Sequence, residues 1–197
     1  MTEVFLRRLT RWQAEQQRES IANVYVECYG PGGTGGFGVT GRSGGSGGPG
    51  GSGEPGGADR KAFLERFERH VQEPDFDMVT ADSGAVLAGC LYGFRAARGS
   101  ALLESLRDVL PADAAGRAGA GRLFVLTELM VLPDYRLEGV ATRLRDLLLS
   151  RHVTDVVVAA VPPGGGVAHE VLRAWSYTKL GAFGSPQKEA WLRAGAG

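Results

Sequence analysis

The segment from Leu123 to Ser150 places the strongest constraint on the fold. It reads LFVLTELMVLPDYRLEGVATRLRDLLLS, and a second apolar run, DVVVAAV, follows at 155–161. The first apolar run predicts a strand, the proline a turn, and the spacing of Val140, Leu144 and Leu148 a helix. Strand, helix and strand in this order form a right-handed crossover between parallel strands. A strand as apolar as 155–161 is typical of one covered on both faces.

The rest of the chain adds an antiparallel part to this sheet. A hairpin is expected around Asp82-Ser83-Gly84, which has turn chemistry. Strands are predicted at 4–9, 76–81, 86–95, 123–132, 155–161, 177–183 and 188–193, and helices at 13–29, 60–72, 137–151 and 167–175. Asp59 is the expected cap of the helix at 60–72. The fold class is therefore mixed α/β: a twisted sheet of six to seven strands with helices on both faces.

Two segments are predicted to lack regular structure. Residues 30–57 hold 16 of the 31 glycines in the chain, which predicts a flexible insert in a single domain spanning 1–197. Its GxGxxG at 36–41 and GxSxG at 41–45 lack a preceding strand and a following helix, so composition explains them. Residues 96–121 are expected to hold a short helix ending at Pro111 and then a mobile loop.

Composition excludes several classes of function. The formal net charge is zero, and the sequence has no basic stripe of the kind that would indicate nucleic-acid binding. No apolar run is long enough for a membrane span, and the start of the chain lacks the apolar region of a signal peptide. Cys28 and Cys90 each lie in an apolar pattern, as expected of reduced thiols in a cytoplasmic protein. The three histidines lack metal-ligand spacing, so no metal is expected.

The residues from Glu128 to Thr142 suit an anion-binding turn. Pro133 ends the strand, Gly139 lets the backbone approach a phosphate closely, and Ala141 keeps the start of the helix narrow. Backbone N–H groups at a helix N-terminus, with the helix dipole behind them, attract phosphate. This stretch, ELMVLPDYRLEGVAT, resembles the signature E-L-x-V-x-P-x-x-R-x-x-G-[IV]-[GA] of the GNAT superfamily of N-acetyltransferases.

The resemblance implies acetyl-CoA as co-substrate. It implies that the strands at 123–132 and 155–161 are splayed, with pantetheine between them and contacted by the backbone of Leu129, Met130 and Val131. The pyrophosphate would lie at the turn. The residues implied there are Arg136, Leu137, Glu138, Gly139, Val140, Ala141 and Thr142. An amine would attack the thioester directly in a ternary complex.

Two catalytic candidates follow from the resemblance. Glu128 occupies the position of a general base in many family members. The alternative is that it faces solvent or is a structural hydrogen-bond acceptor. The family's general acid, a tyrosine, aligns with Leu172 in one register. In a second register Tyr177 supplies it, whereas in the first Tyr177 is a core aromatic at the start of a strand.

Other positions depart from the family pattern. The position after Arg136 is usually small, and here it is Leu137. Glu138 places a negative charge beside the expected pyrophosphate, at a cost of about 1 kcal/mol in water-like surroundings. Arg136, Arg143 and Arg145 are expected to offset that charge.

Together these features predict an acetyl-CoA-dependent N-acetyltransferase. Its acceptor would be an amine of a small molecule or a peptide, and a homodimer is possible. The alternative is a protein of the same fold that binds acyl-CoA with little or no catalysis, as a sensor or structural partner.

Overall fold

The computed structural model describes residues 3–29, 57–164 and 166–193, so most of the glycine-rich tract, with both of its motifs, lies outside the described residues. The strands are β1 (Phe5–Leu9), β2 (Asp77–Ser83), β3 (Val86–Arg95), β4 (Leu123–Val131), β5 (Val156–Val161), β6 (Tyr177–Phe183) and β7 (Lys188–Arg193). The helices are α1 (Arg11–Gln16), α2 (Arg18–Tyr29), α3 (Gly57–Gln72), α4 (Ala101–Arg107), α5 (Ala112–Gly119), α6 (Val140–Leu149) and α7 (Val167–Ala174), with a 3-10 turn at Pro133–Tyr135.

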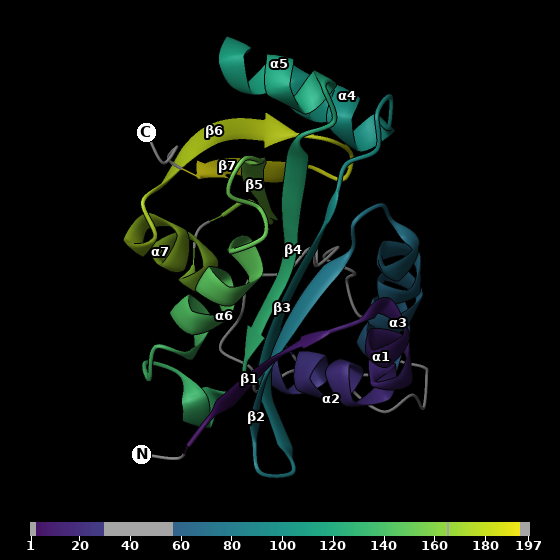
Figure 1. Cartoon of the computed structure of the whole chain (residues 1–197), viewed down its shortest axis with the longest axis vertical. Coiled ribbons are helices and arrows are strands. Elements are labelled where there is room, and N and C mark those ends of the chain that lie inside the picture. The colour runs from purple at the N-terminus through teal and green to yellow at the C-terminus, as the bar shows by residue number, and fades with distance from the viewer. Residues whose placement is uncertain (1–2, 30–56, 165, 194–197) are drawn as a thin grey trace, which may run out of the picture.

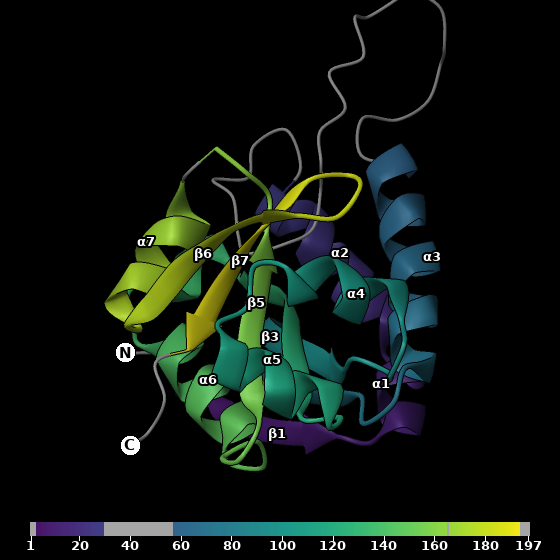
Figure 2. The same ribbon diagram turned by 90° about the horizontal axis from the view of Figure 1, so that it is seen from above.

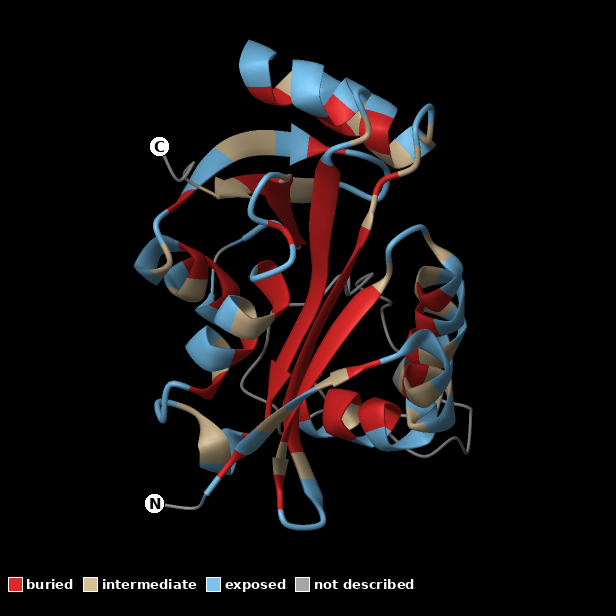
Figure 3. Cartoon of the chain, in the orientation of Figure 1, coloured by how far each residue is buried: buried red, intermediate tan, exposed pale blue. Residues whose placement is uncertain are grey.

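The strands form one mixed sheet in the order β1-β2-β3-β4-β5-β7-β6. Helices α6 and α7 lie on one face, and α1, α2 and α3 lie on the other (Figure 1). Helices α4 and α5 pack near β5 and β7, as the view from above shows (Figure 2). All nine residues of β4 are buried (Figure 3). The predicted mixed sheet with helices on both faces is confirmed.

Three of the predicted helices begin at other residues than expected. The helix predicted at 13–29 is two helices separated at Gln17, and the first is capped by Thr10, whose side chain accepts from the Gln13 backbone. Helix α3 begins at Gly57, two residues before the predicted cap Asp59. The helix predicted from 137 begins at Val140, because a 3-10 turn and a left-handed residue precede it.

The prediction of a mobile loop after Pro111 is wrong, because this segment forms α5. Ala114 and Ala118 lie four residues apart and are both buried in the cluster with strands β4 and β5. Gly116 and Gly119 are exposed, and a Cβ added at either would meet nothing within 4 Å. These two glycines lower the helix propensity of the segment, and packing of its small apolar face offsets their effect.

Strands β4 and β5 are paired only along part of their length. Their parallel register runs from Leu123 opposite Val156 to Leu126 opposite Ala159 and stops there. Strand β4 continues to Val131, while the end of β5 pairs with β7 on its other side. The predicted splay between these two strands is therefore present, with its closed end at the start of both strands.

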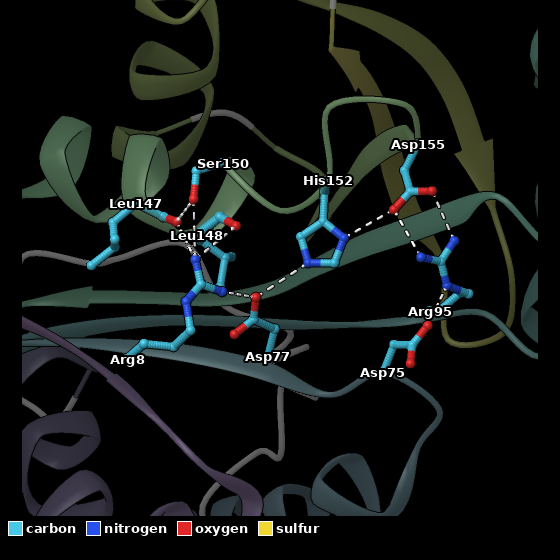
Figure 4. A network of polar contacts seen from close by, with 9 residues as sticks. All are labelled: Arg8, Asp75, Asp77, Arg95, Leu147, Leu148, Ser150, His152 and Asp155. Atoms are coloured by element: carbon cyan, nitrogen blue, oxygen red, sulfur yellow. Dashed lines mark hydrogen bonds and ion pairs between the residues drawn. The ribbon is translucent and has the colours of Figure 1, made fainter.

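A buried polar network ties the strands together at this closed end (Figure 4). His152 follows α6, and its Nε2 lies 3.2 Å from Asp77 Oδ2 while its Nδ1 lies 2.9 Å from Asp155 Oδ2. Arg8 of β1 also pairs with Asp77, and Arg95 of β3 makes two bonds of 2.8 and 3.0 Å to Asp155. Carboxylates only accept, so each arginine donates to one of them, and the imidazole lies between the two.

The network stabilises the ionised carboxyls. Burial raises the pKa of Asp77, but hydrogen bonds from His152 and Arg8 outweigh burial, and the pKa lies below its ordinary value. Burial likewise raises the pKa of Asp155, and hydrogen bonds from Arg95 and His152 bring it below the ordinary value. Groups with lowered pKa values stabilise the fold above the unfolded-state pKa of about 4, and this contribution is lost as the pH falls through the folded-state values.

We predict that His152→Ala lowers the free energy of unfolding by about 2–3 kcal/mol, because two buried carboxylates each lose a partner. Urea denaturation at pH 7 measures this change. The neighbouring exposed substitution Arg151→Ala is the control and should stay within about 0.5 kcal/mol of the wild type. A wild-type-like His152→Ala protein would show that the network contributes nothing to stability.

Candidate cofactor and acceptor site

A cavity of about 360 Å³ lies on the α6 and α7 face of the sheet. This volume is within the usual range of small-molecule sites. Its lining comes from the open end of β4, the turn before α6, and α7. The lining residues are Leu129, Val131, Tyr135, Arg136, Leu137, Gly139, Val140, Ala141, Thr142, Val167, Ala168, Val171, Ala174 and Trp175.

The turn at the mouth of this cavity leaves backbone donors free at the start of α6. Gly139 is the N-cap residue, with φ of 74°, and no side chain bonds the first N–H groups of the helix. A Cβ at Gly139 would meet nothing within 4 Å. Such N–H groups need an external partner, and an anion suits them.

Leu137 has an unusual backbone conformation in this turn. Its φ is 65°, a left-handed value, and its side chain is fully exposed. The sequence marked Leu137 as too large for the family pattern. The structure shows that the backbone there also has a conformation in which a residue without a side chain is favoured.

The open end of β4 presents alternate backbone groups to the gap. Leu132 N donates to Ala88 O at 2.9 Å, so this is a hydrogen-bonded pair of the β3–β4 ladder. Antiparallel pairs alternate, so Met130 also bonds β3 whereas Leu129 and Val131 do not. The backbone N–H groups of Leu129 and Val131 therefore point into the gap, and that of Met130 does not. The carbonyls of Leu129 and Val131 lie on the same edge of β4 but already accept hydrogen bonds, from Tyr29 and from Cys28 and Arg136 respectively.

A β-bulge places Glu128 on the opposite face of the sheet. Tyr92 pairs with Glu128 and Gly93 pairs with Leu126, which leaves Thr127 as the extra residue. Leu126 and Leu129 both pack on the α6 and α7 face. Without the extra residue Glu128 would share that face, because side chains alternate along a strand. With it, Glu128 points toward α2 and α3.

Glu128 is fully buried, so the alternative that it faces solvent is wrong, whereas the alternative that it is a structural hydrogen-bond acceptor stays open. Its Oε2 lies 3.2 Å from an Arg66 nitrogen. Burial raises the pKa of Glu128 to about 7, against the lowering effects of Arg66, Tyr29 and Lys188. A carboxyl with this pKa is suited to proton transfer near neutral pH.

The structure brings most, but not all, of the predicted cofactor residues to the cavity. All of them line the cavity except Met130, which faces the α2 and α3 side, and Glu138, which is exposed. The three arginines expected to offset Glu138 have other contacts: Arg136 donates to Val131 O, Arg143 donates to Val4 O, and Arg145 lies over Trp175.

The two candidates for the acid position both lie outside the cavity lining. Leu172 is fully buried in the apolar cluster beneath α7. Tyr177 is the first residue of β6, as the first register predicts. Strand β6 is separated from β5 by β7, so Tyr177 is two strands away from β5. Its partner Arg193 follows Leu192, which pairs with Val158, so Tyr177 lies at the level where β4 and β5 are still paired. Burial raises the pKa of Tyr177.

Several residues of the site were missed by the sequence reasoning. The α7 wall includes Val171 and Trp175, and Trp175 Nε1 donates to Thr142 at 3.2 Å. Arg66 and Lys188 are close to Glu128 only through tertiary structure. One signal was available: Arg66 lies three residues after Phe63 and so falls near the buried face of α3.

Two features bear on the class of site. Among the described residues, no group of three or more histidine, cysteine or acidic side chains is arranged to hold a metal ion. No helix in the described ranges is long and apolar enough to cross a membrane.

Solved structures show the same fold. No protein-family model and no curated protein matches the sequence. PH1933 from Pyrococcus horikoshii has a TM-score of 0.63 and 14% identity, over 98% of this chain and 99% of that one. A Desulfovibrio desulfuricans protein assigned to the GNAT family of acetyltransferases has a TM-score of 0.60 and 10% identity, over 96% of this chain and 98% of that one. Arabidopsis thaliana NAA60, solved with acetyl-CoA, has a TM-score of 0.59 and 13% identity, over 96% of this chain and 97% of that one. This chain therefore has the fold of the GNAT superfamily of N-acetyltransferases.

Proposed function

We propose that the protein is an N-acetyltransferase that transfers the acetyl group of acetyl-CoA to an amine of a small molecule or a peptide. The observation that carries this proposal is the gap between β4 and β5, which opens beside a cavity ending at the N-terminus of α6. Structural neighbours solved with acetyl-CoA or CoA support it: NAA60 and the aminoglycoside N-acetyltransferase AAC(6')-Iy. The unpaired, buried Cys28 and Cys90 fit a cytoplasmic setting.

The described residues fit acetyl-CoA along its length. The N–H groups at the start of α6 suit the pyrophosphate. The backbone N–H groups of Leu129 and Val131 suit the amide oxygens of pantetheine, which would take the place of the carbonyls of a neighbouring strand. A backbone N–H in this gap also suits the thioester oxygen, where negative charge develops during acyl transfer.

Glu128 is the proposed general base. It lies on the α2 and α3 face, opposite the cavity on the α6 and α7 face, so an amine reaching the gap from its side would approach the thioester from the far side of the cofactor. The amine nitrogen attacks the thioester carbon, the C–S bond breaks, and Glu128 accepts the amine proton, directly or through water.

The leaving thiolate has no side-chain acid in this proposal. Leu172 carries no proton to donate, and Tyr177 is buried two strands away from β5. A CoA thiol leaves tolerably well near neutral pH, so positioning and backbone donors sustain turnover without an acid. The same observation favours the second candidate function, acyl-CoA binding with little catalysis.

We predict that Gly139→Asp weakens acetyl-CoA binding by more than about tenfold, because the added carboxylate faces the pyrophosphate. Calorimetric titration measures the affinity. Gly139→Asn is the matched control, since asparagine tolerates the left-handed conformation and adds no charge. If the two variants bind equally well, the pyrophosphate does not lie at this turn.

We predict that the wild type releases CoA thiol from acetyl-CoA only when an amine is added, and that Tyr177→Phe barely changes the rate, because Tyr177 lies two strands from β5. General acid catalysis typically contributes about 10²–10⁴-fold. A thiol-reactive dye and a panel of amines and peptides measure release. Tight cofactor binding without release would favour the binding-protein alternative. A collapse of activity in Tyr177→Phe, with stability and cofactor affinity unchanged, would make Tyr177 the acid.

A further inference from the structure

A buried ion pair joins α3 to the centre of the sheet. The side chains of Arg66 and Glu128 are 14% and 0% exposed. We propose that Arg66 is a positioning residue that keeps Glu128 ionised and holds one of its oxygens, so that the other can accept the proton of the acceptor amine. This inference rests on the proposed function and adds a residue to it.

Aromatic rings hold the Arg66 guanidinium in place. Its central carbon lies 5.5 Å from the centre of the Tyr25 ring and 5.4 Å from that of Phe63. These two rings stack on each other at 4.4 Å. A planar guanidinium suits this contact, and its position between helix and sheet costs little further ordering.

Only one carboxylate oxygen of Glu128 is engaged. Arg66 contacts Oε2, and Oε1 is buried with no hydrogen-bond partner among the described residues. The Tyr29 hydroxyl donates to Leu129 O at 3.2 Å in this structure, and it is also close enough to Glu128 to lower the pKa of that carboxyl by hydrogen bonding. A buried acceptor atom without a partner is costly, so Oε1 is the atom available to an incoming donor.

The charges around Glu128 assign the main electrostatic role to Arg66. Tyr29 faces it from α2, Arg66 from α3, Cys90 and Tyr92 from β3, and Lys188 from β7. Burial raises the pKa of Glu128, and Arg66 opposes this more than any other group. Burial and repulsion from Arg66 lower the pKa of Lys188. Arginine keeps its charge throughout the working pH range.

The test combines a carboxyl titration with a pH–rate profile. Carbon-13 NMR of protein labelled at glutamate carboxyls, assigned by Glu128→Gln, follows the titration of Glu128 directly. The rate constant kcat/KM for an amine found in the thiol-release panel should rise with pH through the same midpoint, because the base acts when deprotonated. Arg66→Gln should move both midpoints upward by at least about one pH unit, which from a pKa of about 7 lowers the carboxylate fraction at pH 7 about fivefold.

Two variants separate this effect from loss of structure. Arg69→Gln removes a charge from an exposed position of the same helix and should leave both midpoints in place. Arg66→Lys keeps the charge but loses the planar fork of donors. Its two midpoints should therefore equal those of the wild type, while its kcat should be lower than that of the wild type at unchanged acetyl-CoA affinity. If Arg66→Gln does not fold, this loss of kcat in Arg66→Lys decides the question.

The outcomes are distinguishable. Midpoints that stay in place in Arg66→Gln, in an enzyme that turns over, would overturn the role of Arg66 and leave the proposed function standing. Absence of turnover with every amine would overturn the proposed function, while the NMR titration would still show whether Arg66 governs the ionisation of Glu128.

Discussion

The parting of β4 and β5 after Leu126 and Ala159 is the feature on which the site depends. A parallel pair that stayed in register to Val131 would satisfy its own backbone groups and leave none for a ligand. Beyond Ala159, β5 pairs only with β7, so the far half of β4 has no strand partner on that edge. Buried backbone N–H groups without partners are rare in proteins, and those of Leu129 and Val131 face the gap instead of a neighbouring strand.

The closed and open ends of this gap are stabilised in different ways. At the closed end, His152 and two arginines fix the carboxylates of Asp77 and Asp155 among four elements (Figure 4). At the open end, the start of α6 has backbone donors without side-chain caps. Rigidity at one end and unsatisfied donors at the other are what a preorganised anion site requires.

Much of the fold was predictable because local patterns agreed with tertiary structure. The strand at 155–161 follows from its continuous apolar run, and the strands at 177–183 and 188–193 have the predicted bounds. Helix α5 was not predictable from composition, because its buried face consists only of alanines. The bulge at Thr127 depends on pairing with β3, so the face on which Glu128 lies could not be read from the alternation of residues. The pairing of Arg66 with Glu128, 62 residues apart in the chain, is likewise visible only in the folded protein.

Hydrogen exchange of single amides tests the central claim most directly. If β4 presents alternate backbone groups to the gap, the Leu129 and Val131 amides exchange faster than the Met130 amide in the free protein, and saturating acetyl-CoA slows the first two while leaving Met130 unchanged. Exchange of Leu129 and Val131 that is as slow as that of Met130 in the free protein, or that acetyl-CoA does not alter, would contradict the account.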